Sequence, residues 1–307
     1  MIDYSDFRHV FGSSPALSYD RKLVSSIDEH RKKLDGTLFM DRIMKALCTS
    51  RAIKTYPPKS EASLRQLHQQ ICETDMLEPQ KLSLLYYLLL DLDVAGSSNP
   101  AAEHFAAESG MPQSYQIFIK GLWLMDKESW TRALEYVSHP SLSPDFSDEI
   151  IIVLAQHAPK VQGSLALSYF YAVRPMLQSS LALELLFDAM TLASTVEALV
   201  FSRSQPQHTR EQLFQRWLRF IVGGSTGHHS GSCGQELAFI PFDSTEEAWF
   251  EQYLSVGPGR GLKRAKDTLL MRKIAGDRYA EVAKQRAVGP WAAVVEGIRH
   301  GIEGQTE

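Results

Sequence analysis

The chain has 307 residues, of which 44% are hydrophobic and 22% are charged, and its formal net charge is −4. This length and hydrophobic content allow a large core in one or two domains. A charge so close to neutral excludes both a polyanion mimic and a protein that binds nucleic acid through its overall charge.

The cysteines and the N-terminus predict a protein of the cytosol or nucleus that is not inserted in a membrane. Cys48, Cys72 and Cys233 are far apart, odd in number and without a CxxC pair, so we expect no disulfide framework and no zinc ribbon. The N-terminus lacks the basic and apolar parts of a signal peptide. The longest apolar run, Leu84 to Leu90, is far shorter than the roughly 20 residues of a membrane span.

Hydrophobic spacing predicts an all-α fold. Apolar residues recur three and four positions apart in nearly every window, and the strict alternation of a half-buried strand is almost absent. Start signals for helices recur along the chain, and short breaks between them suit antiparallel helical neighbours. The start signals are Asn99 before Pro100, Ser143 before Pro144, and the capping patterns Ser194 to Glu197, Thr209 to Gln212 and Ser244 to Glu247.

The clearest helix is predicted at about residues 113–125, because one apolar stripe is formed by Tyr115, Phe118, Ile119, Leu122 and Trp123. A second helix follows at once, with a stripe formed by Trp130, Ala133, Leu134 and Val137. Asp126 lies between the two helices, and we expect it to cap the second one. The pair therefore predicts a tight helical hairpin.

Taken together, these segments predict an irregular, α-solenoid-like stack of antiparallel helical hairpins, although no sequence period identifies a named repeat family. We expect a helical domain over residues 1–256, in which residues 1–56 could form a separate subsegment. A basic helical segment is expected over residues 257–307, after the Gly-Pro-Gly-Arg-Gly sequence at 257–261. That sequence is interpreted as a linker and not as a phosphate loop, because no strand precedes it and Pro258 removes an amide donor.

Residues 257–289 carry nine Lys or Arg against three acids, a surplus of six charges on a chain that is acidic overall. This segment could contact an acidic face of a partner protein, or it could be a solvated helix face. Nucleic acid is the weaker alternative, because aromatic residues are absent from the segment apart from Tyr279. The candidate contact residues are Arg260, Lys263, Arg264, Lys266, Arg272 and Lys273.

We expect no catalytic, cofactor or metal site. His228, His229 and Cys233 offer zinc ligands, but their spacing fits no known finger and the Gly/Ser-rich loop supplies no fourth ligand, so a solvated loop is the preferred interpretation. No nucleophile elbow, HExxH helix or Walker loop occurs in a sequence context that supports such a site. Isolated acids are attributed to helix ends and solvated faces: Asp91, Asp93, Glu149 and Glu184.

The predicted hairpin resembles the signature of the ELYS-like nuclear pore assembly family. In that family a helix with an aromatic residue, glycine, leucine and tryptophan ends in an acid, and an alanine-leucine helix then ends in a His-Pro turn. The matching positions are Phe118, Gly121, Leu122, Trp123, Asp126, Ala133, Leu134, Tyr136, His139 and Pro140. The resemblance extends from about Lys81 to Leu254 and includes the stretch from Ile240 to Glu247. We expect these residues to form core and turns and not a binding site.

The resemblance implies a structural nucleoporin of the nuclear envelope, without cofactor or small-molecule substrate. It would dock on the Y-shaped outer-ring complex of the nuclear pore, through the arm that carries β-propeller nucleoporins, and support nucleocytoplasmic and mRNA transport. The sequence is similar to a short fungal form, without the β-propeller and the basic, DNA-binding tail of animal members, which argues against direct DNA binding. A helical adaptor of another large assembly is the alternative, and an unrecognised helical enzyme is the more distant one.

Overall fold

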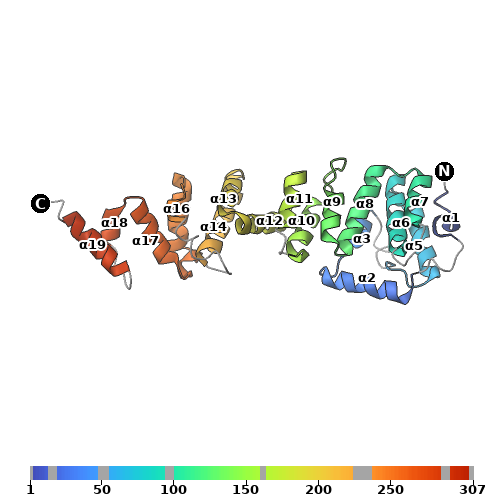
Figure 1. The fold of residues 1–307 in the computed structure, drawn as a ribbon, viewed down its shortest axis with the longest axis horizontal. Helices are drawn as coiled ribbons and strands as arrows, with labels where there is room; N and C mark the ends of the chain where they lie inside the picture. The colour runs from blue at the N-terminus through green and yellow to red at the C-terminus, as the bar shows by residue number, and fades with distance from the viewer. Residues whose placement is uncertain are drawn as a thin grey trace. The chain divides into compact units, whose positions relative to one another are not determined.

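The structure is a computed structural model that describes residues 3–12, 19–47, 55–93, 100–159, 164–223, 237–284 and 291–303. Within these ranges every regular element is a helix, which confirms the all-α prediction (Figure 1). The chain divides into two compact units, Met1–Leu186 and Phe187–Glu307, here called the first and the second unit. Helix α12 (Ser180–Ala193) crosses the division.

The first unit is built around one buried helix. Its helices are α1 (Phe7–Phe11), α2 (Arg21–Lys33), α3 (Phe39–Leu47), α5 (Glu61–Glu73), α6 (Glu78–Asp93), α7 (Ala101–Ser109), α8 (Gln113–Asp126), α9 (Trp130–Val137), α10 (Ser147–His157) and α11 (Leu165–Val173). Every residue of α6 from Leu82 to Leu92 is buried, because α3, α5, α7 and α8 all pack around it. A helix surrounded in this way is expected to be apolar on nearly all faces, and the leucine-rich sequence of α6 agrees apart from the buried Ser83 and Asp91.

The predicted hairpin at residues 113–137 is present as α8 and α9 (Figure 1). The two helices approach closely at Gly121, where an added Cβ atom would lie only 2.7 Å from Cγ1 of Val137 and 3.0 Å from Cβ of Tyr136. A side chain at position 121 would therefore push α9 away. The glycine of the family signature is explained by this close approach.

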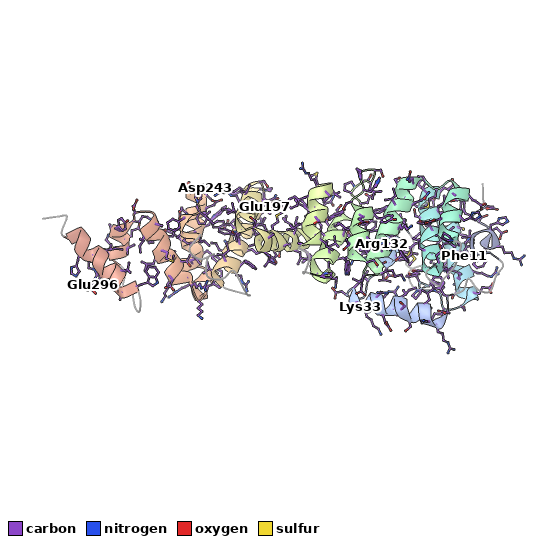
Figure 2. The ribbon with its side chains drawn as sticks, viewed as in Figure 1. Phe11, Lys33, Arg132, Glu197, Asp243 and Glu296 are labelled. Carbon is purple, nitrogen blue, oxygen red and sulfur yellow. The ribbon has the colours of Figure 1, made fainter. Side chains whose placement is uncertain are left out.

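The described helices before Pro57 pack onto the rest of the first unit. Helix α3 packs against α6 and α8, and the carboxylate of Asp41 on α3 accepts hydrogen bonds of 2.9 Å from Arg31 on α2. At the end of α2, His30 and Lys33 each lie 2.8 Å from Oε1 of Glu128, in the turn between α8 and α9 (Figure 2 labels Lys33). These contacts join the first helices to the hairpin.

In the second unit, each helix packs against its neighbours in sequence. The helices are α13 (Thr195–Arg203), α14 (Gln207–Gly223), α16 (Ser244–Ser255), the 3₁₀ helix η1 (Pro258–Gly261), α17 (Ala265–Ala275), α18 (Tyr279–Ala283) and α19 (Trp291–Glu303). The expected boundary at residue 256 lies inside this unit, because α16 packs against both η1 and α17. Gly259 of η1 lies against Tyr253 so closely that a Cβ atom at this position would clash with the ring.

Some of the helix starts predicted from the sequence agree with those in the structure. Ser194 caps α13 by accepting a hydrogen bond from the backbone N–H of Glu197, as predicted. The cap of α16 is Asp243 and not Ser244, and it forms a capping box with Glu246. The prediction at Thr209 was wrong, because α14 already begins at Gln207. Asn99 lies outside the described residues.

Candidate partner-binding surface and the polar networks behind it

The ten residues of the family signature lie in the α8–α9 hairpin and in the turn that follows it. Gly121, Leu122, Asp126 and Ala133 are buried, while the aromatic members of the set are half-buried. The His139–Pro140 turn is exposed at both residues. The hairpin members therefore lie in or beside the core, where their side chains fix the positions of neighbouring helices.

Asp126 caps a helix other than the one we expected. Its two carboxylate oxygens accept hydrogen bonds from the backbone N–H groups of Phe39 (2.7 Å) and Met40 (3.1 Å), at the start of α3. Tyr87 of α6 donates a further bond of 2.6 Å. Burial raises the pKa of the Asp126 carboxyl to about 7, although these hydrogen bonds act to lower it.

The sequence could not show this because Asp126 is the last residue of α8, and its side chain points across the unit and away from the next turn. Helix α9 begins after Ser129 without a side-chain cap. A buried carboxylate needs donors, and the free amides at the start of α3 supply them. Asp126 is thus a second link, besides Glu128, between the family hairpin and the N-terminal helices.

Asp91 is a second buried carboxylate, which sequence reasoning had assigned to a helix end or a solvated face. Its side chain is completely buried, and Oδ2 accepts hydrogen bonds from the hydroxyls of Tyr56 (2.7 Å) and Tyr19 (3.2 Å). Oδ1 accepts one from the indole of Trp123 (2.9 Å) and lies 3.1 Å from Nζ of Lys127. The signal that could have identified it is an acid inside an otherwise continuous apolar run, where a charge must be paired.

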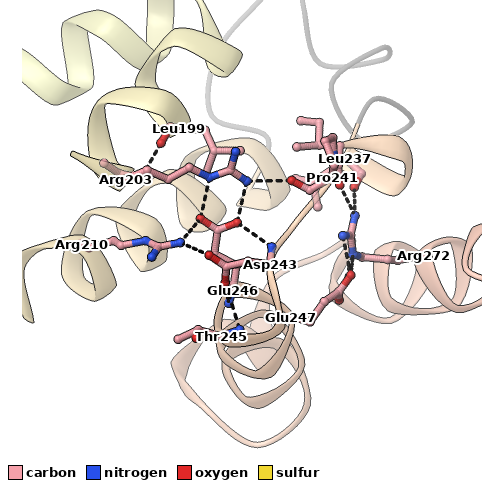
Figure 3. A network of polar contacts seen from close by, with 12 residues as sticks. Leu199, Arg203, Arg210, Leu237, Pro241, Asp243, Thr245, Glu246, Glu247 and Arg272 are labelled. Atoms are coloured by element: carbon pink, nitrogen blue, oxygen red, sulfur yellow. Dashed lines mark hydrogen bonds and ion pairs between the residues drawn. The ribbon is translucent and has the colours of Figure 1, made fainter. Parts of the chain in front are cut away.

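In the second unit, Glu246 is the centre of an ion-pair network (Figure 3). The Glu246 side chain is fully buried and binds Arg203 at 2.7 Å and Arg210 at 2.6 Å. Arg210 also pairs with Asp243, and Arg203 donates to the carbonyl oxygen of Pro241. The network joins α13, α14 and the start of α16, although 43 residues separate Arg203 from Glu246 in the sequence.

Arg272, one of the six candidate contact residues, is part of the interior and not of a surface. It is 6% exposed, pairs with Glu247 and donates to the carbonyl oxygens of Leu237 (2.8 Å) and Ile240 (3.0 Å). Its guanidinium also lies 3.8 Å from the ring centroid of Phe242. We therefore remove Arg272 from the candidate surface: its donors are already satisfied and its cation is covered by an aromatic ring.

The other five candidates differ in their availability. Lys273 is partly buried and pairs with Glu281 at 2.6 Å, and Arg264 is partly buried at the start of α17. Arg260, Lys263 and Lys266 are exposed, and none of the three has an ion-pair partner among the residues that the structure describes. We call these three the basic surface.

Arg219 of α14 is a further exposed cation of the second unit. This exposed residue of α14 acts electrostatically on the phenol of Tyr253, whose ring also packs against Gly259 of η1. Arg260 follows Gly259 directly. Tyr253 therefore contacts η1 and is influenced by a cation of α14, although about forty residues separate Arg219 from Arg260.

The network around Glu246 should make the stability of the second unit depend on pH. Hydrogen bonding by Arg210 holds the pKa of Asp243 below its ordinary value of 3.8. Burial acts to raise the pKa of Glu246, but hydrogen bonds from Arg203 and Arg210 keep it below 4.5. Carboxylates with lowered pKa values stabilise the fold above their unfolded-state values, and this stability is lost as the pH falls through the folded-state values.

We therefore expect the second unit to become easier to unfold with urea between about pH 5 and pH 3. Glu246→Gln, which cannot ionise, should have a shallower pH dependence over the same range. Urea titrations at several pH values, followed by hydrogen exchange of α13, α14 and α16, would measure both. Parallel curves for the two proteins would contradict the prediction.

The sequence predicted neither a metal site nor a membrane span, and the structure bears on these predictions only within the described residues. His228, His229 and Cys233 lie outside the described residues. Among those that the structure does describe, no cluster of three potential metal ligands occurs. In the same ranges, no helix has both the length and the apolar character needed to cross a bilayer.

The structure is that of an all-α protein made of packed helices, with buried ion-pair networks and with exposed basic residues in the second unit. The model of the ELYS family, described as nuclear pore complex assembly, matches residues 37–257, which is more than two thirds of the chain. The chain therefore belongs to the ELYS family, and the resemblance seen in the signature hairpin is confirmed. The match begins well before Lys81, where the resemblance in sequence became evident, and so includes α3, which Asp126 caps.

A curated relative is similar to part of the chain. The uncharacterized protein ely5 of Schizosaccharomyces pombe is 26% identical over 138 residues, which are 44% of this chain and 44% of the relative. The similarity thus spans less than half the length of that protein. Family membership supports a role in nuclear pore assembly and association with the nuclear pore.

Proposed function

We propose that this protein is a non-enzymatic structural nucleoporin, which docks on the Y-shaped outer-ring complex at the nuclear envelope and supports nucleocytoplasmic transport, including that of mRNA. The observation that carries the proposal is the family match over residues 37–257. An all-α fold with its charged groups paired inside suits a scaffold subunit, because such a subunit needs rigid helices and accessible surfaces. Its direct partners would be the β-propeller nucleoporins of the outer-ring arm.

The basic surface is the proposed contact. Arg260, Lys263 and Lys266 are exposed and unpaired among the described residues, so they could face an acidic patch of a partner without losing an internal ion pair. Complementary charge raises the rate of association and selects partners. The role of this surface predicts sensitivity to salt, because exposed charges are screened at high ionic strength.

Charge reversal tests the proposal better than removal of residues 257–307. Truncation would strip Gly259 from Tyr253 and Arg272 from Glu247, and the loss of folding would be confused with the loss of binding. We expect a chain with Arg260→Glu, Lys263→Glu and Lys266→Glu to remain folded and to recover about tenfold less of the outer-ring nucleoporins. Affinity purification of tagged full-length protein from its own cells, with quantitative mass spectrometry, would measure this.

A matched control reverses three exposed cations of the first unit, Lys32, Lys59 and Arg132, none of which has an ion pair within the described ranges. The control should recover the same partners as the unmodified chain. Equal recovery by both triple variants would remove the basic surface from the proposal. Recovery of a different assembly by the unmodified chain would overturn the proposed function and favour a helical adaptor of that assembly.

A further inference from the structure

A groove of about 530 Å³ opens on the first unit, away from the basic surface in sequence. It lies between the end of α3, the beginnings of α6 and α8, and the segment 141–149 before and within α10. Its volume is in the range of sites that hold small ligands or peptide side chains. Its apolar lining includes Ile43, Tyr115, Phe118, Ile119, Leu142 and Phe146.

One wall of the groove is held in a strained conformation. Phe146 has a φ of 54°, in the left-handed region that bulky side chains avoid. Its ring packs near that of Phe118, at 6.5 Å between centroids. Directly after it, the hydroxyl of Ser147 donates to the carbonyl oxygen of Pro144 (2.6 Å) and lies 3.0 Å from the hydroxyl of Tyr169.

The strained backbone at Phe146 persists because these contacts fix the turn. The end of α3 also lines the groove, and Ala46 is exposed there. The groove is therefore formed in advance, so a ligand would not have to order this wall on binding.

The polar residues at the edge of the groove give it a negative charge. Asp145 is exposed and Glu149 is partly exposed, and neither makes an ion pair within the part of the chain that the structure describes. Burial lowers the pKa of the Arg42 guanidinium on α3, and the charge of Glu149 is among those that oppose this shift, although the two residues form no ion pair. An apolar floor with two free carboxylates at its edge complements an apolar side chain next to a cation.

We propose that this groove binds a short peptide segment of a partner protein, with a large apolar side chain on the floor and an adjacent Lys or Arg facing Asp145 and Glu149. Phe118, a family-signature residue, would then have a second role beside its place in the hairpin, as one wall of the site. The inference rests on the geometry of the first unit alone and does not depend on the nuclear pore role.

The test uses the full-length chain and a displayed library of short random peptides as the probe. We expect enrichment of sequences in which an aromatic or large aliphatic residue lies within a few positions of Lys or Arg. The most enriched sequence, made as a labelled synthetic peptide, should bind the unmodified chain in a fluorescence polarisation titration. Its affinity should fall when the groove is filled or when its charge is reversed.

Two variants and one control make the titration specific. Ala46→Arg places a long cation in the groove from an exposed position, and Asp145→Lys reverses an exposed charge at its edge. Each should weaken binding by about tenfold or more. Glu135→Lys makes the same charge change at an exposed position of α9 that does not line the groove, and it should bind as the unmodified chain does. Thermal unfolding would confirm that all variants are folded, and Asp145→Lys carries the test if Ala46→Arg is not.

Several results would overturn the proposal. The library could yield no enriched sequence, or enriched sequences without a basic residue. The synthetic peptide could bind Ala46→Arg and Asp145→Lys as tightly as the unmodified chain. Concentration-dependent dimerisation in sedimentation, lost in Ala46→Arg, would assign the groove to a second copy of this chain instead.

Discussion

Asp91→Ala is expected to lower the free energy of unfolding of the first unit by about 3–5 kcal/mol. The substitution leaves Lys127, which is only 15% exposed, without its carboxylate. It also removes the acceptor of Tyr56 and Trp123 and one of the two acceptors of Tyr19. Buried donors that lose their acceptor keep the full cost of their desolvation. Urea unfolding, followed by hydrogen exchange of peptides from α3, α6 and α8, would measure the loss in this unit.

Two further variants test whether the loss of stability in Asp91→Ala comes from the buried network. Asp91→Asn keeps one carbonyl acceptor but no charge, and it should lose less stability than Asp91→Ala. Asp75→Ala removes an exposed carboxylate that has no ion pair among the described residues, and the change should be within about 0.5 kcal/mol. A loss for Asp91→Ala as small as that for Asp75→Ala would show that the network does not hold the unit together.

Glu246→Ala is expected to cost the second unit about 2–4 kcal/mol of unfolding free energy. Glu246 is fully buried and pairs with two arginines, so its removal leaves Arg203 and Arg210 facing each other without a shared anion. Both guanidinium groups remain partly exposed, at 35% and 20%, and water therefore offsets some of the cost. Hydrogen exchange of α13, α14 and α16 in urea would report the change.

Asp243→Ala provides the comparison, because Asp243 binds the same Arg210 but is 48% exposed. It should cost about 1 kcal/mol, mainly through loss of the cap of α16. Comparing the losses of unfolding free energy in Glu246→Ala and Asp243→Ala separates the contribution of the buried carboxylate from that of the exposed one. Equal losses would mean that the cap, and not the buried charge, stabilises the joint between α13, α14 and α16.

The same two carboxylates show where prediction from sequence ends. Capping boxes are local, so the start of α16 could be predicted to within one residue, and Asp243 is found beside the predicted Ser244. The two arginines that hold Glu246 come from α13 and α14, and no spacing in the sequence indicates this pairing. The six candidate contacts illustrate the same limit: Arg272 and Lys266 are both cations in one basic segment, yet one is buried and the other exposed.

The sequence by itself determined the all-α class, the α8–α9 hairpin and the family, because helical periodicity, turn residues and signature residues are encoded within short segments. Only the tertiary structure decided that Asp126 caps α3, that Asp91 and Glu246 are buried hubs, and that Phe118 and Phe146 form one wall of a groove. These features join segments about thirty to ninety residues apart. A charged residue is acceptable inside a protein only where distant donors converge on it, and that convergence is a property of the packed helices.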